Sequence, residues 1–450
     1  MSLYENDGTE TGHVPAATDL IGSGQEGTIG DQARSWLQRV RGGDMGALPA
    51  VGGFVVLSIL FTILSQVIIG RQFFLTTANF ANLAQQAAPL VMLGIALVFV
   101  ILLGEIDLSA GVTAGTSMAF FVVLATRFDL TLHLGPIVIP GWIFALIVAF
   151  IVGLAIGTLI GFFVARVGIP SFVVTLGLFL GLQGVQLVVI GAGGSINVQI
   201  PEIRAIQNGY LPDWGGWLML VIALAVSAGT AFWDRARRTR AGVPNRTIAL
   251  VWVKLATLLI VGGGVVFLLN QNRGRAATVL NGVEVGGNSV IGVPIVVPIV
   301  LVILWVGTFV LDRTRYGRYL YAIGGNAEAA RRAGVKVVLI KWWAFIICST
   351  LAVVAGVFTA SRVGSVDAAM GRDLVLSGVA AAVVGGVSLF GGRGRLVHAA
   401  VGALVIAVIT NGLGLLGLPA GANYAVTGSV LILAATVDAL SRRRAGGVRL

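Results

Sequence analysis

Residues 84–104 read AQQAAPLVMLGIALVFVILLG, and no charged side chain interrupts them. A helix that crosses the hydrocarbon core of a bilayer needs about 20 mostly apolar residues, because each residue adds only about 1.5 Å. The stretch meets this length without the polar face that a surface helix of a soluble domain carries. It therefore predicts a membrane-spanning helix.

The composition extends this interpretation to the whole chain. Hydrophobic residues make up 57% of the 450 residues and charged residues only 11%, whereas soluble domains carry about 25% charged residues. We therefore predict an all-α, polytopic integral membrane protein with about 12 transmembrane segments, or about 10 if some are half-helices or re-entrant. The candidate spans are 48–69, 84–104, 108–126, 141–165, 171–192, 215–233, 248–269, 291–311, 341–361, 374–390, 396–416 and 422–440.

The basic residues predict the orientation of these spans. If the N-terminus lies inside and the spans alternate, most of the 30 Lys and Arg residues fall in the inside gaps. Cytoplasmic loops carry such an excess, so both termini are predicted to be cytoplasmic. The net charge of +11 is then explained by membrane orientation, and nucleic-acid binding is not expected.

The two ends of the chain differ from the transmembrane domain at 48–440. Residues 1–47 are polar and predict a mostly disordered cytoplasmic tail, with a possible interfacial helix at 32–41. Residues 441–450 form a basic cytoplasmic tail.

A short sequence similarity within the chain indicates an internal two-fold repeat. GEIDLSAG at 104–111 and GGVSLFGG at 385–392 share glycine, a branched apolar residue, leucine and glycine at the same spacing. Each follows an apolar run. Transporters built from two repeats place the substrate pathway where the repeats meet.

The gap at 312–341 is longer than a turn between two spans requires, and it predicts a capped cytoplasmic helix. Asn326 is a good N-cap and Gly334 a good C′ residue for a helix over Ala327–Ala333. Glu328 lies in its first turn, and Arg331 and Arg332 in its last turn, as the helix dipole favours. Ala329, Ala330 and Ala333 form a small smooth face. This helix either seats in a groove on a cytoplasmic partner or is an idle surface helix.

Four motifs in order resemble a known family. They are LLGEIDLSAG at 102–111, GIPSFVVTLG at 168–177, GGNAEAARRAGV at 324–335 and VVGGVSLFGGRG at 383–394. Together they are similar to bacterial ABC-type monosaccharide permeases, in the superfamily that includes ribose, xylose and branched-chain amino acid permeases. The pair of spans near 215–269 with its basic linker resembles an insertion in the D-xylose branch.

The resemblance implies a permease subunit in the bacterial inner membrane that carries a monosaccharide, such as xylose. It implies a cytoplasmic ABC ATPase that binds ATP and Mg²⁺, an extracytoplasmic sugar-binding protein and a second permease subunit, in a homodimer. The helix Ala327–Ala333 would couple the ATPase to the spans. The chain itself has no GxxxxGK[ST] phosphate loop, so we expect neither catalysis nor a bound cofactor.

Polar residues near the spans are the remaining candidates. The signature motif comprises Gly104, Glu105, Ile106, Asp107, Leu108, Ser109 and Gly111. We expect Asp107 to lie at a membrane edge and to cap the following helix with help from Ser109; substrate contact and proton transfer are weaker alternatives. The candidate sugar pathway comprises Gln85, Gln86, Gln183 and Gln186, although such amides also serve in interhelical packing.

Other functions are open at this point. The permease could carry another sugar or a branched-chain amino acid. An ion-coupled secondary transporter would need ionisable groups within the membrane, and the candidate spans contain almost none. The three histidines have no metal-ligand spacing, so no metal site is predicted.

Overall fold

The structure is a computed structural model in which helices predominate. It describes residues 46, 48–128, 130–134, 137–242, 248–274, 278–280, 283–285 and 289–446. The predicted interfacial helix at 32–41 lies outside the described residues.

The prediction of a polytopic helical membrane protein is confirmed. Among the described residues, 10 helices are long and apolar enough to cross a membrane. They are α3 (Leu48–Ile69), α4 (Thr77–Ile101), α5 (Ala110–Arg127), α6 (Gly141–Gly161) with its continuation η1 (Phe162–Val167), α7 (Ser171–Ile190), α9 (Asp213–Arg240), α10 (Ile248–Leu269), α11 (Val296–Arg313), α14 (Val337–Val363) and α16 (Leu396–Leu415).

Two of the predicted spans differ from this pattern. The stretch at 374–390 contains only α15 (Arg372–Val384), whose 13 residues extend about 20 Å, less than the hydrocarbon thickness of about 30 Å. The stretch at 422–440 lies within α17 (Ala420–Gly446), whose described apolar part, Ala420–Thr436, is shorter than the other spans. The lower estimate of about 10 full-length spans therefore fits the structure better than 12.

The chain divides into two compact units. The described part of the smaller unit comprises 220–242 and 248–264, which is most of α9 and α10. Within it, Gly262 allows close packing, because a Cβ there would lie 2.7 Å from Leu220 Cδ1. All features described below belong to the larger unit.

Helix α4 forms the centre of the larger unit. In its most apolar window 83% of the residues are buried, against 11% in α3, as expected for a helix that is apolar on all sides. Met92, Leu93 and Ile95 are fully buried. Helix α14 packs along both α4 and α6, and α16 also packs on α4.

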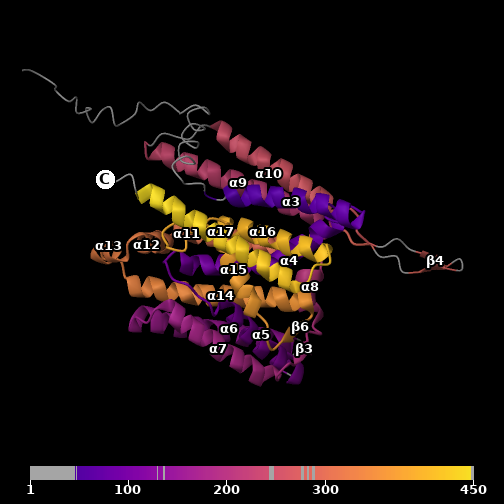
Figure 1. Ribbon diagram of the computed structural model, residues 1–450, viewed down its shortest axis with the longest axis horizontal. Coiled ribbons are helices and arrows are strands. Elements are labelled where there is room, and N and C mark those ends of the chain that lie inside the picture. Colours follow the sequence, from indigo (N-terminus) through magenta and orange to yellow (C-terminus); the bar gives the residue numbers. More distant parts are fainter. Residues whose placement is uncertain are drawn as a thin grey trace, which may run out of the picture. The chain divides into compact units, whose positions relative to one another are not determined.

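The ends of α14 define two faces of this unit. One end, near α12 (Arg315–Gly325) and α13 (Ala327–Arg332), is termed the inner face, because the basic residues predict that it is cytoplasmic. The other end, near α8 (Pro201–Asn208), is termed the outer face (Figure 1).

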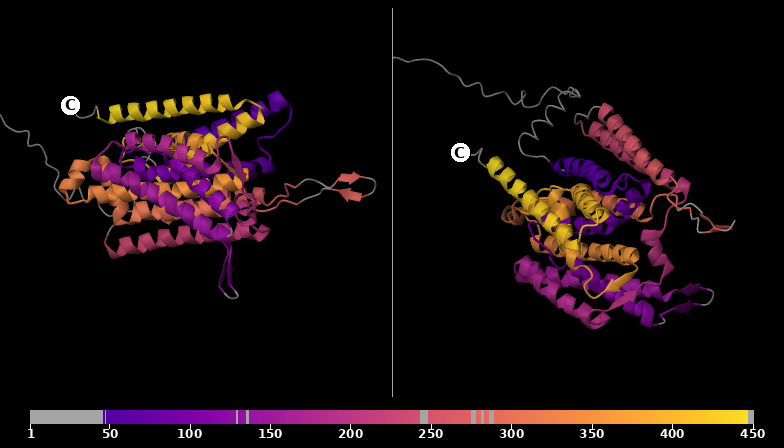
Figure 2. Two further views of the ribbon diagram at one scale, coloured as in Figure 1. Left: turned by 90° about the horizontal axis from the view of Figure 1, so that it is seen from below. Right: turned by 45° about the vertical axis from the view of Figure 1, so that its right-hand side comes forward.

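Short strands accompany the helices. At the outer face β3 (Ser195–Asn197) pairs antiparallel with β6 (Ser365–Asp367). Two hairpins, each a pair of antiparallel strands, extend away from the helices (Figure 2). They are β1 (Leu132–Leu134) with β2 (Ile137–Ile139), and β4 (Thr278–Leu280) with β5 (Val283–Val285).

The structure reveals an internal repeat centred on two segments, 104–111 and 364–371, which are non-helical except for Ala110 and Gly111 at the start of α5. Their sequences, GEIDLSAG and GSVDAAMG, share glycine, a branched residue, aspartate and glycine at the same spacing. Gly104 and Gly364 both adopt left-handed backbone, with φ of 76° and 77°. In each segment the aspartate Oδ1 accepts a hydrogen bond from the backbone N–H two residues later, over 2.9 Å and 2.8 Å.

The predicted partner of GEIDLSAG was therefore wrong, although a repeat exists. Gly385 has φ of −64°, unlike Gly104. Residues near Gly392 instead lie beside the first motif, since the Gly392 N–H donates to Leu102 O over 2.8 Å. The two glycine-rich motifs are spatial neighbours and not equivalent positions.

The last glycines of the two repeated segments cross at van der Waals contact. A Cβ on Gly111 would lie 2.1 Å from Gly371 O, and one on Gly371 would lie 1.9 Å from Gly111 O. Only glycine fits at this crossing, because the obstructing atoms are backbone atoms that cannot rotate away.

We predict that Gly111→Ala destabilises the protein by about 3 kcal/mol or more, as severe overpacking does. Thermal unfolding of the purified protein in detergent measures this. The control is Gly177→Ala on α7, where nothing lies within 4 Å of the added Cβ. Unchanged unfolding of Gly111→Ala would show that the crossing is not closely packed.

Candidate functional site

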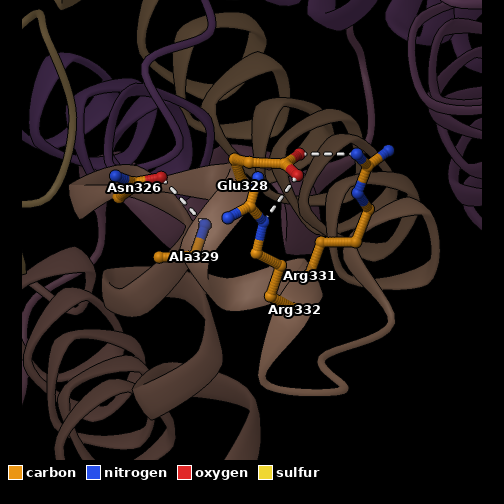
Figure 3. Close-up of polar contacts among 5 residues, drawn as sticks. All are labelled: Asn326, Glu328, Ala329, Arg331 and Arg332. Atoms are coloured by element: carbon orange, nitrogen blue, oxygen red, sulfur yellow. Dashed lines mark hydrogen bonds and ion pairs between the residues drawn. The ribbon is translucent and has the colours of Figure 1, made fainter.

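Helix α13 occupies the position predicted for the coupling helix and ends one residue earlier than expected, at Arg332. Asn326 Oδ1 accepts a hydrogen bond from the Ala329 N–H over 2.9 Å, which caps the N-terminus (Figure 3). At the other end the N–H groups of Gly334 and Val335 donate to Arg331 O and Ala330 O. This is the Schellman arrangement, with Gly334 at φ of 83°.

Charges of α13 are organised around one carboxylate. Glu328 contacts Arg331 over 2.6 Å and Arg332 over 3.1 Å (Figure 3). Hydrogen bonds from these two guanidinium groups lower the pKa of Glu328, so the carboxylate stays ionised at neutral pH. All three side chains are exposed and therefore accessible to a partner.

The predicted smooth alanine face needs a correction. Ala330 is buried, with 6% of its surface exposed, and belongs to the hydrophobic core. Ala329 and Ala333 remain exposed, together with Ala327. The helix thus uses one alanine to anchor itself and presents the others outward.

Contacts of α12 join α13 to the core. Gly324 approaches α4 so closely that a Cβ would lie 1.8 Å from Leu102 O. The Tyr321 hydroxyl donates to Gly394 O over 2.7 Å. Nearby, Lys341 Nζ lies 2.5 Å from Glu105 Oε1 and joins the start of α14 to the end of α4. These contacts thus link the region of α12 and α13 to α4, to the start of α14 and to the segment before α16.

The signature motif at 104–111 lies mostly inside the protein. Asp107 was expected at a membrane edge, which stays a prediction; its side chain is fully buried within the protein. Its Oδ1 accepts hydrogen bonds from the N–H and the hydroxyl of Ser109, over 2.9 and 2.6 Å. Ser109 itself holds the N-cap position of α5 and makes no side-chain capping bond.

The backbone of this motif is stabilised by α7. The Ile106 N–H donates to Ser171 Oγ over 3.2 Å, and Ile106 O accepts from Thr175 Oγ1 over 3.3 Å. These two hydroxyls belong to the GIPSFVVTLG motif. The second motif therefore supplies hydrogen bonds that the non-helical backbone of the first cannot obtain from its own segment.

The four candidate pathway amides do not form one site. Gln85 Nε2 donates to Gln207 O over 2.6 Å, close to the outer face, and Gln86 lies beside it on α4. On α7, Gln183 Oε1 accepts from Arg372 Nε over 3.2 Å, whereas Gln186 Nε2 donates to Val112 O over 3.0 Å. The Gln186 Nε2 group thus bonds to the neighbouring helix α5, while Gln186 Oε1 is buried with no hydrogen-bond partner among the described residues.

The structure adds polar residues that sequence analysis missed. Arg362 Nη2 lies 3.3 Å from Asn82 Oδ1, on the side of α4 that also carries Gln85 and Gln86. Arg362 Nη1, Gln86 Oε1 and both side-chain amide atoms of Gln207 are buried, with no hydrogen-bond partner among the described residues. In the sequence Arg362 was only a basic residue of an outside gap, and no signal distinguished it.

We predict that Asp107→Ala reduces the free energy of unfolding by about 1–3 kcal/mol, because it leaves buried N–H and O–H donors unpaired. Asp367→Ala is the matched control, since it removes the equivalent bond at an exposed side chain. Yield of folded protein and thermal unfolding provide the measurement. Normal folding of Asp107→Ala with an altered sugar preference would contradict this structural role.

Comparisons with known proteins identify the family of the chain. Residues 79–249 and 205–435 match the family described as branched-chain amino acid transport system / permease component. The xylose transport system permease protein of Escherichia coli (strain K12) is 32% identical over 412 residues, covering 88% of this chain and 97% of that protein.

Two further relatives extend the comparison. The xylose transport system permease protein of Haemophilus influenzae is 32% identical, covering 82% of this chain and 91% of that protein. The ribose import permease protein of Escherichia coli (strain K12) is 28% identical, covering 81% and 87%. No solved structure matches the chain. The chain is thus a multi-pass membrane protein that belongs to the branched-chain amino acid transport system / permease component family.

Proposed function

We propose that this chain is the permease subunit of an ATP-driven importer in the bacterial inner membrane and that it carries a monosaccharide, namely a pentose such as xylose. The observation that carries the proposal is the match to xylose permeases over 88% of the chain. The capped, exposed helix α13 at the inner face supports the same function.

Three kinds of partner follow from this proposal. A cytoplasmic ABC ATPase binds ATP and Mg²⁺ and receives α13. An extracytoplasmic binding protein delivers the sugar to the outer face, and a second copy of the permease completes the pathway. The chain itself acts as a transport subunit and not as an enzyme. ATP hydrolysis takes place on the ATPase.

The contacts of α12 and α13 suggest how the ATPase drives transport. When the two ATPase domains close, they move α13, which is anchored through Ala330. The motion passes through Gly324 to Leu102 at the end of α4 and through Tyr321 to Gly394. Both segments lead towards the glycine crossing, so the two repeats tilt against each other and alternate access between the faces.

Polar side chains near the outer face suit a sugar. Gln85, Gln86 and Asn82 share one side of α4, where Arg362 and Gln207 provide further donors and acceptors. Sugar hydroxyls both donate and accept hydrogen bonds, as these groups require. We place the entry of the pathway at this cluster. Gln183 and Gln186, both on α7, belong to a different part of the route.

A branched-chain amino acid is the second candidate substrate, because the family description names this class. Competition for uptake distinguishes a pentose from a branched-chain amino acid as the substrate. We predict that unlabelled xylose or ribose in excess reduces the uptake of radiolabelled xylose into proteoliposomes that contain the complete complex, whereas leucine does not. Uptake of leucine without uptake of pentoses would reverse the assignment.

Coupling is tested by changes in α13. We predict that Glu328→Arg and Gly334→Pro abolish ATP-dependent xylose uptake in proteoliposomes containing the ATPase and the binding protein. The first reverses the charge that organises the helix, and the second removes the Gly334 N–H donor of the C-terminal cap. Arg166→Glu is the matched control, an exposed charge reversal at the end of η1.

The outcomes separate the candidate mechanisms. Uptake retained in both α13 variants would contradict coupling through this helix. Uptake that needs an ion gradient and no ATPase would instead identify a secondary transporter. Each variant is first checked for folding by thermal unfolding, so that loss of uptake reports coupling.

A further inference from the structure

One pair of charged residues lies at the start of α15, and the residues of the helix that follow it are mostly apolar. Arg372 and Asp373 begin α15, and both side chains are exposed. Helix α15 runs from Arg372 to Val384, and the glycine that follows lies against His398 near the start of α16. Its 13 residues place the two charges about 20 Å from the inner end of the helix.

About 20 Å is less than the hydrocarbon thickness of about 30 Å, so the pair lies within the bilayer when the inner end of α15 lies at its inner edge. The chain reaches the outer face at Gly364, at the end of α14, and then returns through 365–371 before α15 begins. Gly371, next to Arg372, touches Gly111 at the crossing of the repeats. Charged side chains at such a depth are costly when they face lipid, and they normally face a partner or water.

The neighbours of the pair are polar and belong to two other helices. Arg372 Nε donates to Gln183 Oε1 on α7 over 3.2 Å. Asp373 Oδ2 accepts a hydrogen bond from the Tyr424 hydroxyl on α17 over 2.6 Å. Gln183 is 7% exposed and Tyr424 is 58% exposed, so the four side chains extend from the protein interior to its surface.

A purely structural role does not account for all of this. An acidic residue in the first turn stabilises a helix, which explains an aspartate at position 373 in α15. It does not explain why Arg372 and Tyr424 accompany it on an exposed surface. A lipid-facing surface here would be apolar, as it is at Ile59 near the middle of α3, which is 54% exposed.

We propose that Arg372, Asp373, Gln183 and Tyr424 form a water-exposed wall of the translocation pathway that hydrogen-bonds the passing sugar. This proposal rests on the proposed importer function and adds the binding surface that the sugar meets after the outer face. Aspartate accepts, arginine donates, and glutamine and tyrosine do both, so together they match the hydroxyl groups of a pentose. Such a surface favours polyols over apolar solutes of the same size.

The first experiment tests exposure to water. Asp373→Cys and Ile59→Cys are treated in the assembled complex with a charged, membrane-impermeant methanethiosulfonate reagent. The native Cys348 is fully buried, so the unmodified chain provides the background. We expect Asp373→Cys to react about tenfold or more faster than Ile59→Cys, because a thiol ionises to the reactive thiolate only where water reaches it. Equal rates would overturn the proposal.

The second experiment tests contact with sugar. Asp373→Asn and Tyr424→Phe remove one charge and one hydroxyl, and radiolabelled xylose uptake is compared with ATP hydrolysis stimulated by the loaded binding protein. We expect uptake per ATP to fall about tenfold in Asp373→Asn and less in Tyr424→Phe, in line with the loss of a charged and a neutral hydrogen bond. Uptake per ATP equal to that of the parent in both variants would overturn the sugar contact.

The two experiments separate this proposal from the proposed function. If the parent complex imports no pentose, the importer assignment fails, and the sugar contact fails with it. Fast labelling of Asp373→Cys would still establish the water-exposed wall. If the parent imports xylose and Asp373→Cys reacts no faster than Ile59→Cys, only the wall is wrong.

Discussion

The fold depends on satisfying non-helical backbone inside the membrane. Lipid offers no hydrogen bonds, so irregular segments persist at that depth only where the protein supplies partners. The segment 104–111 meets this condition with a buried aspartate that accepts from the backbone two residues later, and the segment 364–371, which begins at the outer face, has the same bond. Hydroxyls of α7 bind one segment, and the β3–β6 pairing binds the other. The two segments then cross at Gly111 and Gly371.

The crossing explains why the inner face and the pathway are connected. Helices α4 and α14 each lead into one of the two segments, and they pack against each other with opposite directions, joined by Glu105 and Lys341. The segment near Gly392 and helix α12 both rest on Leu102. These contacts link the inner face to the helices that frame the crossing, as the proposed coupling through α13 requires. Closely packed contacts of this kind transmit displacement because they cannot deform gradually.

Much of the architecture could be predicted from the sequence. Uninterrupted apolar runs predicted the spans, and the N-cap and C′ residues predicted α13 to within one residue, because both signals are local. The capped helix also exposes the charges that the sequence suggested. Its alanine face was predicted less well, since burial of Ala330 depends on tertiary packing.

The remaining features depend on contacts between distant segments. The true repeat was missed because GGVSLFGG matched GEIDLSAG by composition, whereas the equivalent GSVDAAMG follows a span and resembles an outside loop. The position of Arg372 and Asp373 at the start of a short helix was missed for the same reason. The start of α15 depends on a contact between distant segments, that of Gly371 with Gly111. Gln85 and Gln183 were found by their polarity, but their separation could not be seen in one dimension.

We propose that α13 is the surface through which the ATPase drives this permease. A cryo-electron microscopy structure of the chain with its ATPase, recorded with and without a non-hydrolysable ATP analogue, tests this most directly. The account predicts that α13 sits in a groove of the ATPase and moves together with α12 and the end of α4 when nucleotide binds. An ATPase that contacts other elements and leaves α13 free would contradict it.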